Sequence, residues 1–304
     1  MKHSGETVMF TETRTLQPKA PFDFAMSLGF LDEFPAMHGE QRVNERALTK
    51  AVVIDEQAVV FSVRSVGTVD QPKLSYTLYC ANPISEALAR AADDRIAFFL
   101  SLNDDLTPFY SIAEQDGAFQ PILKNWYGHH QVKFLTPFEH TCWAILGQRI
   151  PMPVAQSIKQ GIAERFGNAL EVEGVVYHAF PSAKQLLAAA AQLPEVVAYG
   201  RKAEYLIAAA RAFDGVNEDW LRSAPSDDVE AWLRTIKGIG AWSARFVLIR
   251  GLGHMDRQSV GEERLIEAAR KRYGRALSEA QLREIGAKYG SSQGYWAYYL
   301  RISA

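Results

Sequence analysis

Two glycines bracket a single isoleucine just before a tryptophan in the segment Leu233–Asp256, which reads LRTIKGIGAWSARFVLIRGLGHMD. The sequence predicts a helix that ends near Ile236, a tight turn, and a second helix from Ala241, with Ile239 buried as a peg. Glycine accepts a positive φ, and the first turn of a helix leaves backbone N–H groups without partners. These donors suit a phosphate oxygen, so we expect Gly238 and Gly240 to admit a phosphate. A plain helix end with a C-cap glycine is the alternative.

Charge is distributed unevenly along the 304 residues, although the formal net charge is only −2. From Ala231 to Ala304 there are 13 Lys and Arg against 6 Asp and Glu, a net charge of +7, which leaves −9 for the rest. A basic C-terminal quarter on an acidic body suggests one face that binds a polyanion. Ordinary helices with solvated basic residues are the alternative.

Several classes of protein are disfavoured by composition. The N-terminus has no basic stretch followed by an apolar run, and no segment approaches the ~20 apolar residues of a membrane span. Cys80 and Cys142 are the only cysteines, which is too few for a four-cysteine zinc or iron–sulfur site. We therefore expect a soluble, cytoplasmic protein that does not bind a membrane and has no iron–sulfur cluster.

The pattern of apolar residues predicts an α+β fold. Residues 1–104 are expected to form an antiparallel β-sheet domain with a following helix, because Ala51–Gly67 and Lys73–Cys80 alternate apolar and polar residues. Residues 105–304 are expected to form an all-helical body that contains the hairpin at 233–251. Helices are predicted over 83–102, 136–150, 153–167, 182–193, 201–213 and 226–236, with a short β-hairpin over 168–180.

Three segments together resemble a known family. The run L-x-x-I-x-G-I-G-x-W-S-A, from Leu233 to Ala244, resembles the hairpin of the helix-hairpin-helix DNA glycosylase superfamily. The segments AILGQ (Ala144–Gln148) and RKAEYL (Arg201–Leu206) resemble the bacterial 3-methyladenine DNA glycosylase II type, which removes alkylated purines. The resemblance covers about Asp105 to Leu300, and that branch also has an N-terminal sheet domain. It implies a monomer that acts on double-stranded DNA in base excision repair and requires no cofactor.

The resemblance implies a catalytic carboxylate after the hairpin's second helix, in a D-x-x-(aliphatic) setting. Aligning the pair Leu265-Ile266 with the family's aliphatic pair implies Glu263, with Glu262 and Asp256 as the other candidates. An acid that only stabilises a helix start is the alternative. Breaking an N-glycosidic bond builds positive charge on the deoxyribose, and a nearby anion stabilises that charge and can activate a water. Glutamate is one methylene longer than the family's aspartate, so its carboxylate must be drawn back.

The residue after G-I-G-A separates two kinds of glycosylase. Members that also cut the strand have a lysine there, which forms a Schiff base, whereas Trp242 cannot attack a sugar carbon. The resemblance therefore implies a monofunctional enzyme that leaves an abasic site. It also implies that Trp242 and Phe246 line the base pocket, where their rings attract a cationic base. Core packing of this pair is the alternative. Further pocket residues are expected among Gln148, Tyr289, Tyr295 and Trp296.

Extrusion of a base leaves a hole that a side chain can fill. In relatives the turn after AILGQ carries this wedge, and here it offers Arg149, Ile150 and Met152. We expect Ile150, with helix packing as the alternative. The residues expected to contact DNA are thus Arg149, Ile150, Gly238, Ile239, Gly240 and Ser243. The resemblance also implies a Na⁺ or K⁺ ion on the backbone carbonyls of Arg234, Ile236 and Ile239.

Other motifs favour no metal chemistry. His129 and His130 are adjacent, but no acid or histidine lies at a convincing ligand spacing, so we interpret them as polar loop residues. Three hypotheses remain: a glycosylase for alkylated purines, a glycosylase-like protein that binds damaged or bent DNA without chemistry, and a scaffold whose sheet domain binds a protein.

Overall fold

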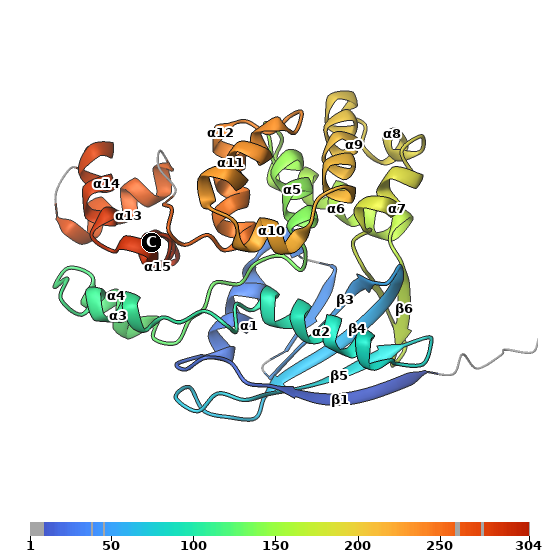
Figure 1. The fold of residues 1–304 in the computed structure, drawn as a ribbon, viewed down its shortest axis with the longest axis horizontal. Coiled ribbons are helices and arrows are strands. Elements are labelled where there is room, and N and C mark those ends of the chain that lie inside the picture. The colour runs from blue at the N-terminus through green and yellow to red at the C-terminus, as the bar shows by residue number, and fades with distance from the viewer. Residues whose placement is uncertain (1–8, 38, 45, 259–261, 275–276, 304) are drawn as a thin grey trace, which may run out of the picture.

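The computed structural model of the chain describes residues 9–37, 39–44, 46–258, 262–274 and 277–303. In this part of the chain a five-stranded antiparallel sheet lies beside a helical body, which confirms the predicted α+β fold (Figure 1). The strand order is β1-β5-β4-β3-β2, so β1 pairs with the last strand of the β2–β5 meander. The strands are β1 (Phe10–Leu16), β2 (Gln41–Val43), β3 (Ala47–Ile54), β4 (Gln57–Ser65) and β5 (Leu74–Cys80).

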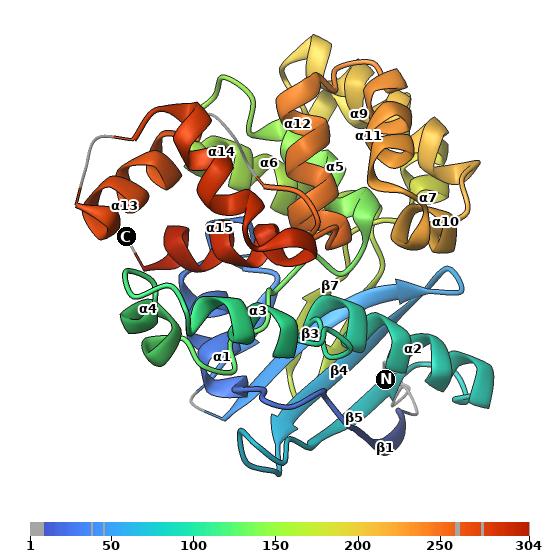
Figure 2. The same cartoon turned by 60° about the vertical axis from the view of Figure 1, so that its left-hand side comes forward.

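The sheet is covered on both faces. One face of β4, which includes Val59 and Phe61, packs in the main core with helix α2 (Glu86–Phe99), and both views show α2 lying along the sheet (Figures 1 and 2). The opposite face, which includes Val60, packs against the short hairpin of β6 (Ala169–Val172) and β7 (Val175–His178). A segment of the predicted helical body therefore returns to complete the sheet domain.

The run Ala51–Gly67 contains a reversal that its alternating pattern hides. Strand β3 ends at Ile54 and β4 begins at Gln57, with Asp55 and Glu56 both at positive φ, 49° and 60°. These angles are those of a two-residue hairpin turn, which usually contains Asn or Gly. The acidic pair gave no such signal, so the sequence showed one long run where the structure has two strands.

The helical body consists of two groups of helices (Figure 2). Helices α5, α6, α9, α11 and α12 share the main core, while α3, α4, α13, α14 and α15 surround a second apolar cluster. Among the residues described, no helix combines the length and the apolar character needed to span a bilayer. The remaining bounds are α1 (Phe24–Glu33), α3 (Thr107–Ala113), α4 (Gln120–Asn125), α5 (Pro137–Leu146), α6 (Met152–Phe166), α7 (Ala183–Ala188), α8 (Leu193–Val196), α9 (Gly200–Asp214), α10 (Glu218–Ser223), α11 (Ser226–Thr235), α12 (Ala241–Phe246), α13 (Glu263–Tyr273), α14 (Glu279–Ala287) and α15 (Gln293–Ile302), with a π-helix at Val247–Leu252 and 3₁₀ turns at Pro35–Met37 and Gly290–Ser292.

Buried charges join the N-terminal domain to the body. The ammonium of Lys159, on α6, forms ion pairs with Glu40 and with Glu139, the latter at 2.8 Å. Glu40 precedes β2 and is also 3.5 Å from the ammonium of Lys50 on β3. All four side chains are buried, so each charge depends on the others for compensation.

Candidate functional site

The Gly-Ile-Gly turn adopts the predicted helix-hairpin-helix geometry. Helix α11 ends at Thr235, Gly238 has a φ of +93°, and α12 begins at Ala241 with Gly240 as its N-cap. Ile239 is buried, and its N–H donates to the carbonyl of Ile236 at 3.0 Å. No side chain of the described residues caps α12, so its first N–H groups are free to bind an anion.

The two glycines have different reasons for being glycine. A Cβ atom at position 238 would lie 2.4 Å from a ring carbon of Tyr205, and the positive φ also disfavours a side chain. The Cβ position of Gly238 is therefore closed by a tyrosine ring of α9, while the expected contact of its backbone with a phosphate stays a prediction. A Cβ at position 240 would meet no described atom within 4 Å, so the open approach to the backbone lies at Gly240.

A groove of about 900 Å³ opens beside the hairpin. The sequence indicated much of its lining, namely Gln148, Arg149, Ile150, Gly238, Ile239, Gly240, Trp242 and Ser243. It did not indicate Tyr199, Arg201, Lys202 and Tyr205, which come from the start of α9. The RKAEYL motif that contains three of them was recognised as a family segment, but no side chain in it was given a role.

The turn after α5 lines the groove with the expected residues, but these residues differ in burial. Ile150, the expected wedge, is half-buried and packs against the main core. Arg149 is exposed and has a φ of +55°, which is unusual for a residue other than glycine. The side chain of Gln148 donates to the carbonyl of Gly238 at 2.9 Å and to the hydroxyl of Ser243 at 3.3 Å. Ser243 is buried and its hydroxyl braces the turn, while its expected contact with DNA stays a prediction.

Aromatic side chains lead inward from the groove. Trp242 is 56% exposed and stacks on Phe246, with 5.1 Å between ring centroids. Phe246 in turn lies 4.6 Å from the ring of His140, which stacks on Phe134 at 4.5 Å. His140 is fully buried, neither of its ring nitrogens has a hydrogen-bond partner among the described residues, and burial lowers its pKa well below the ordinary value.

The three C-terminal aromatics expected in the pocket lie elsewhere. Tyr289, Tyr295 and Trp296 are buried in the second apolar cluster, where α15 packs on α3 and α4. Tyr289 donates to Asp116 at 3.1 Å, and Trp296 donates to the hydroxyl of Tyr273 at 3.1 Å. A neighbour on the same helix, Tyr298, faces the candidate site instead.

Glu262 and Glu263 point in different directions. Glu263 is exposed on the first turn of α13 and forms no hydrogen bond or ion pair with any residue that the structure describes. Glu262 is the N-cap residue, its side chain is 21% exposed, and it pairs with Arg301 at 3.1 Å. Residues three apart share a helix face, and Leu265, three residues after Glu262, is buried. The inward position thus belongs to Glu262, which corrects the alignment that placed Glu263 there.

Glu262 lines a narrow cleft of about 10 Å³ with Arg250, Tyr298 and Arg301. The guanidinium of Arg250 is buried, lies 4.5 Å from the ring centroid of Tyr298, and donates to Gln131 at 3.1 Å. Burial lowers the pKa of Arg250. Asp256 is the third candidate carboxylate, but it accepts from the hydroxyl of Ser226 at 2.6 Å and pairs with Arg257 at 3.2 Å.

One helix connects the groove to this cleft. Trp242, Phe246 and Arg250 are spaced four residues apart along α12 and the π-helix that continues it. This spacing places them along one side of the helix, with Trp242 at the groove and Arg250 beside Glu262. A π-helical turn is rare and is often found at functional sites. Gly251 belongs to it, and a Cβ there would lie 2.2 Å from a ring nitrogen of His140.

No group of three or more His, Cys, Asp or Glu among the described residues could hold a metal ion. His129 and His130 lie in a loop, as interpreted, but both are fully buried. His129 bonds the hydroxyl of Tyr298 at 2.9 Å, and His130 bonds the carbonyl of Ser101 at 2.7 Å. Burial lowers the pKa of His129 to about 3. The carbonyls of Arg234, Ile236 and Ile239 lie in the hairpin, and the cation there stays a prediction.

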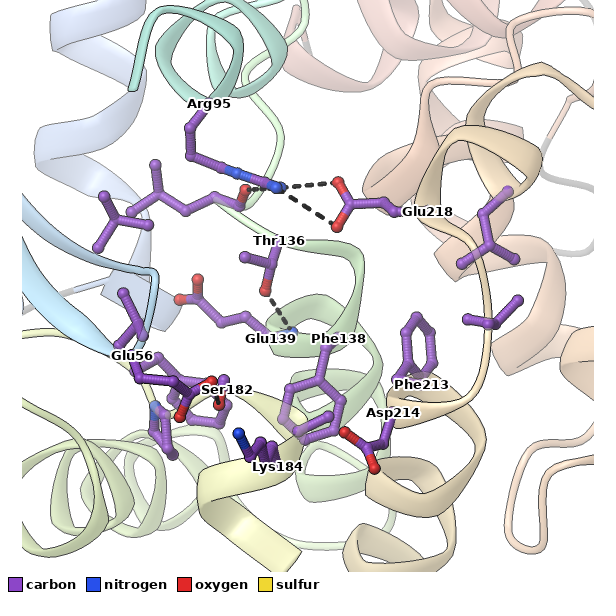
Figure 3. Close-up of a pocket in the computed structure, with 18 of the residues that line it drawn as sticks. Glu56, Arg95, Thr136, Phe138, Glu139, Ser182, Lys184, Phe213, Asp214 and Glu218 are labelled. Carbon is purple, nitrogen blue, oxygen red and sulfur yellow. Dashed lines mark hydrogen bonds and ion pairs between the residues drawn. The ribbon is translucent and has the colours of Figure 1, made fainter. Parts of the chain in front are cut away.

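A second cavity, of about 320 Å³, lies between the sheet and the helical body (Figure 3). At this cavity, Arg95 of α2 forms an ion pair with Glu218 of α10 at 2.7 Å. The hydroxyl of Thr136 accepts from the backbone N–H of Glu139 at 3.0 Å. The cavity adjoins the first residues of α5, whereas the groove adjoins the turn after its last residue. The residues expected to contact DNA or to act in chemistry do not line it, so it is not the candidate site.

Comparison with known proteins agrees with this geometry. The chain is 26% identical to a DNA-3-methyladenine glycosylase of Bacillus subtilis over 92% of its own length and 93% of that protein. The 3-methyladenine DNA glycosylase of Archaeoglobus fulgidus superposes with a TM-score of 0.79 at 22% identity, covering 95% of this chain and 97% of that one. The chain has the fold of the helix-hairpin-helix DNA glycosylases. The resemblance to the 3-methyladenine type is thereby confirmed.

The same fold also occurs in enzymes of the other kind. An 8-oxoguanine glycosylase/lyase of Clostridium acetobutylicum, solved with double-stranded DNA, superposes with a TM-score of 0.68 at 19% identity, covering 96% of this chain and 97% of that one. No family model matches the sequence. The fold alone therefore does not decide between a glycosylase and a glycosylase/lyase, so the local chemistry of the site must do so.

Proposed function

We propose that this chain is a DNA glycosylase that excises alkylated purines from double-stranded DNA and leaves an abasic site. One observation carries the proposal: a single helix runs from the groove, where Trp242 lies, to the cleft that holds the inward carboxylate of Glu262. The name of the Bacillus subtilis relative, which spans nearly the whole chain, supports the substrate class.

The N–H groups at the start of α12 and Arg201 provide donors and positive charge for the DNA backbone. Arg149 projects where a wedge is needed and replaces Ile150 as our candidate. Trp242 offers an exposed ring to an extruded base while Phe246 supports it by stacking, and a cationic purine gains from contact with the indole.

Glu262 replaces Glu263 as the proposed catalytic carboxylate. As the N-glycosidic bond breaks, positive charge develops on the deoxyribose, and a fixed anion stabilises it. The ion pair with Arg301 holds the carboxylate at the cleft. A water activated by Glu262 then completes hydrolysis. An alkylated purine that is already cationic leaves without a proton from an acid, so the chemistry needs no cofactor. If the hairpin binds Na⁺ or K⁺, the carbonyls of Arg234, Ile236 and Ile239 would hold it next to a phosphate.

We further propose that the enzyme has no lyase activity. Strand cleavage through a Schiff base needs an available amine, and the position after the hairpin is occupied by Trp242. Lys202, which lines the groove, is engaged with backbone carbonyls, and Lys237, next to Gly238 in the turn, pairs with Glu204 at 2.9 Å. We expect the protein to act as a monomer, which size-exclusion chromatography with light scattering would check.

The test is release of methylated purines from duplex DNA, measured by chromatography. Glu262→Gln should lower the single-turnover rate by about 100-fold or more, whereas Glu263→Gln should remain within about threefold of wild type. The products should break only after alkaline heating, and borohydride should trap no covalent complex. Loss of activity in Glu263→Gln but not in Glu262→Gln would refute the assignment of the carboxylate, and borohydride trapping would refute the absence of a lyase.

A further inference from the structure

A lysine that the sequence left without a role occupies the junction between the groove and α5. Lys202 is on the first turn of α9 and is only 8% exposed. Its ammonium donates to the carbonyls of Ile145 and Gln148, each at 2.7 Å, and to the carbonyl of Leu146 at 2.9 Å. It forms no ion pair with a carboxylate in the part of the chain that the structure describes. Burial lowers its pKa, and the three carbonyls are the partners that the structure gives its ammonium.

These carbonyls belong to the end of α5 and the turn that follows. The last carbonyls of an α-helix have no partner within the helix, and a cation at that end also interacts favourably with the helix dipole. An ammonium group has three donors, and here each of them can meet one carbonyl. Lys202 therefore fixes the C-terminal end of α5 and the start of the turn that follows it.

The residue fixed in this way connects two parts of the groove. Lys202 holds the backbone carbonyl of Gln148, while the side chain of Gln148 donates to Gly238 of the hairpin at 2.9 Å. The next residue, Arg149, is exposed at a positive φ that a side chain rarely adopts. Such strain persists only where the surroundings over-determine it, and the three bonds from Lys202 supply that constraint.

We propose that Lys202 is a positioning residue for base extrusion. It holds the turn in the form that projects Arg149 into the groove and fixes this turn relative to the phosphate-binding hairpin. Lys202 itself touches neither the base nor the reacting atoms. The inference depends on the proposed function only in so far as the groove receives DNA, because extrusion can be measured without base release.

Lys202→Met removes the donors and keeps an unbranched side chain of similar length, whereas Lys202→Arg keeps the charge and several donors. Lys184→Met is the matched control, since it removes one exposed lysine outside the groove. Extrusion is measured by the fluorescence of 2-aminopurine placed beside an abasic-site analogue in a duplex. Release of a methylated purine is measured from a fully paired duplex and from one in which the lesion is unpaired.

Because extrusion costs least for an unpaired base, Lys202→Met should slow release from the paired duplex by about tenfold and from the unpaired one by no more than about twofold. The 2-aminopurine signal should fall in parallel, Lys202→Arg should recover most of it, and Lys184→Met should match wild type. Adding Lys202→Met to Arg149→Ala should cause little further loss, because the two changes act on one step.

An equal loss on both duplexes would mean a general structural role and would overturn the proposal, as would an unchanged 2-aminopurine signal. Circular dichroism confirms that each variant is folded. If Lys202→Met does not fold, Gln148→Ala removes the side-chain bond that joins the same turn to Gly238 of the hairpin. Gln148→Ala should show the same difference in rate between the two duplexes, and equal rates would equally refute the proposal. If wild type releases no base but extrudes 2-aminopurine in a Lys202-dependent way, the proposed function fails while this inference stands.

Discussion

Replacing each hairpin glycine with alanine should separate stability from DNA binding. At position 238 the new methyl group would lie 2.4 Å from a ring carbon of Tyr205, and the backbone has a φ of +93°. A side chain at such a φ costs about 1–2 kcal/mol, and overpacking a filled site costs about 1–3 kcal/mol. We expect Gly238→Ala to lower the free energy of unfolding by about 2–5 kcal/mol, because both effects act together.

Gly240→Ala is the matched change in the same turn. Its backbone has a φ of −88°, and the methyl group would meet no described atom within 4 Å, so the free energy of unfolding should change by less than about 1 kcal/mol. The methyl group would, however, occupy the open approach to the backbone, so DNA affinity should fall. Urea denaturation and fluorescence anisotropy with a duplex measure the two quantities. Equal unfolding midpoints for the two variants would refute the assignment of Tyr205 as the constraint at Gly238.

Three further predictions concern the pocket and the groove. His140 is held neutral, because burial lowers its pKa. The unfolded chain takes up a proton at this histidine below pH ~6.5, so the free energy of unfolding falls below that pH by at most ~1.4 kcal/mol per pH unit. His140→Phe should therefore gain stability relative to wild type between pH 6.5 and 5, and parallel denaturation curves would contradict this. Trp242→Ala should slow release of a cationic purine by about 2- to 30-fold through loss of a cation–π contact, and Trp242→Phe by less; an equal effect on a neutral purine would argue against that contact. Arg201→Ala should reduce the slope of log affinity against log salt by about 1, and an unchanged slope would remove Arg201 from the phosphate contacts.

Features that depend on neighbours in the chain could be predicted from the sequence. The hairpin needs a positive φ, a buried peg and a bare helix start within four residues, so Gly238, Ile239 and Gly240 indicated it locally. The strand alternation and the helices α5 and α6 followed from apolar periodicity in the same way. The ring of Tyr205, which requires a glycine at position 238, lies more than thirty residues away in the sequence and left no local signal.

Features that depend on packing were predicted less well. Choosing between Glu262 and Glu263 requires the residue at which α13 begins, and one position rotates a side chain by about 100°. The C-terminal aromatics Tyr295, Trp296 and Tyr298 look alike in sequence and all three are buried, but of these three Tyr298 lines the cleft. The burial of His130 could not be predicted because its partner Ser101 is remote in the chain.

The ion pairs around Lys159 bear on why this chain has a β-sheet at all. Removing residues 1–104 would delete Glu40 and Lys50 and would leave Lys159 and Glu139 as an isolated pair with newly exposed surroundings. Glu139 stands at the start of α5, and the opposite end of that helix carries the turn of Gln148 and Arg149. The sheet domain thus anchors the N-terminal end of α5, while the turn after its C-terminal end lines the groove. We do not expect a helical fragment alone to keep this turn in position.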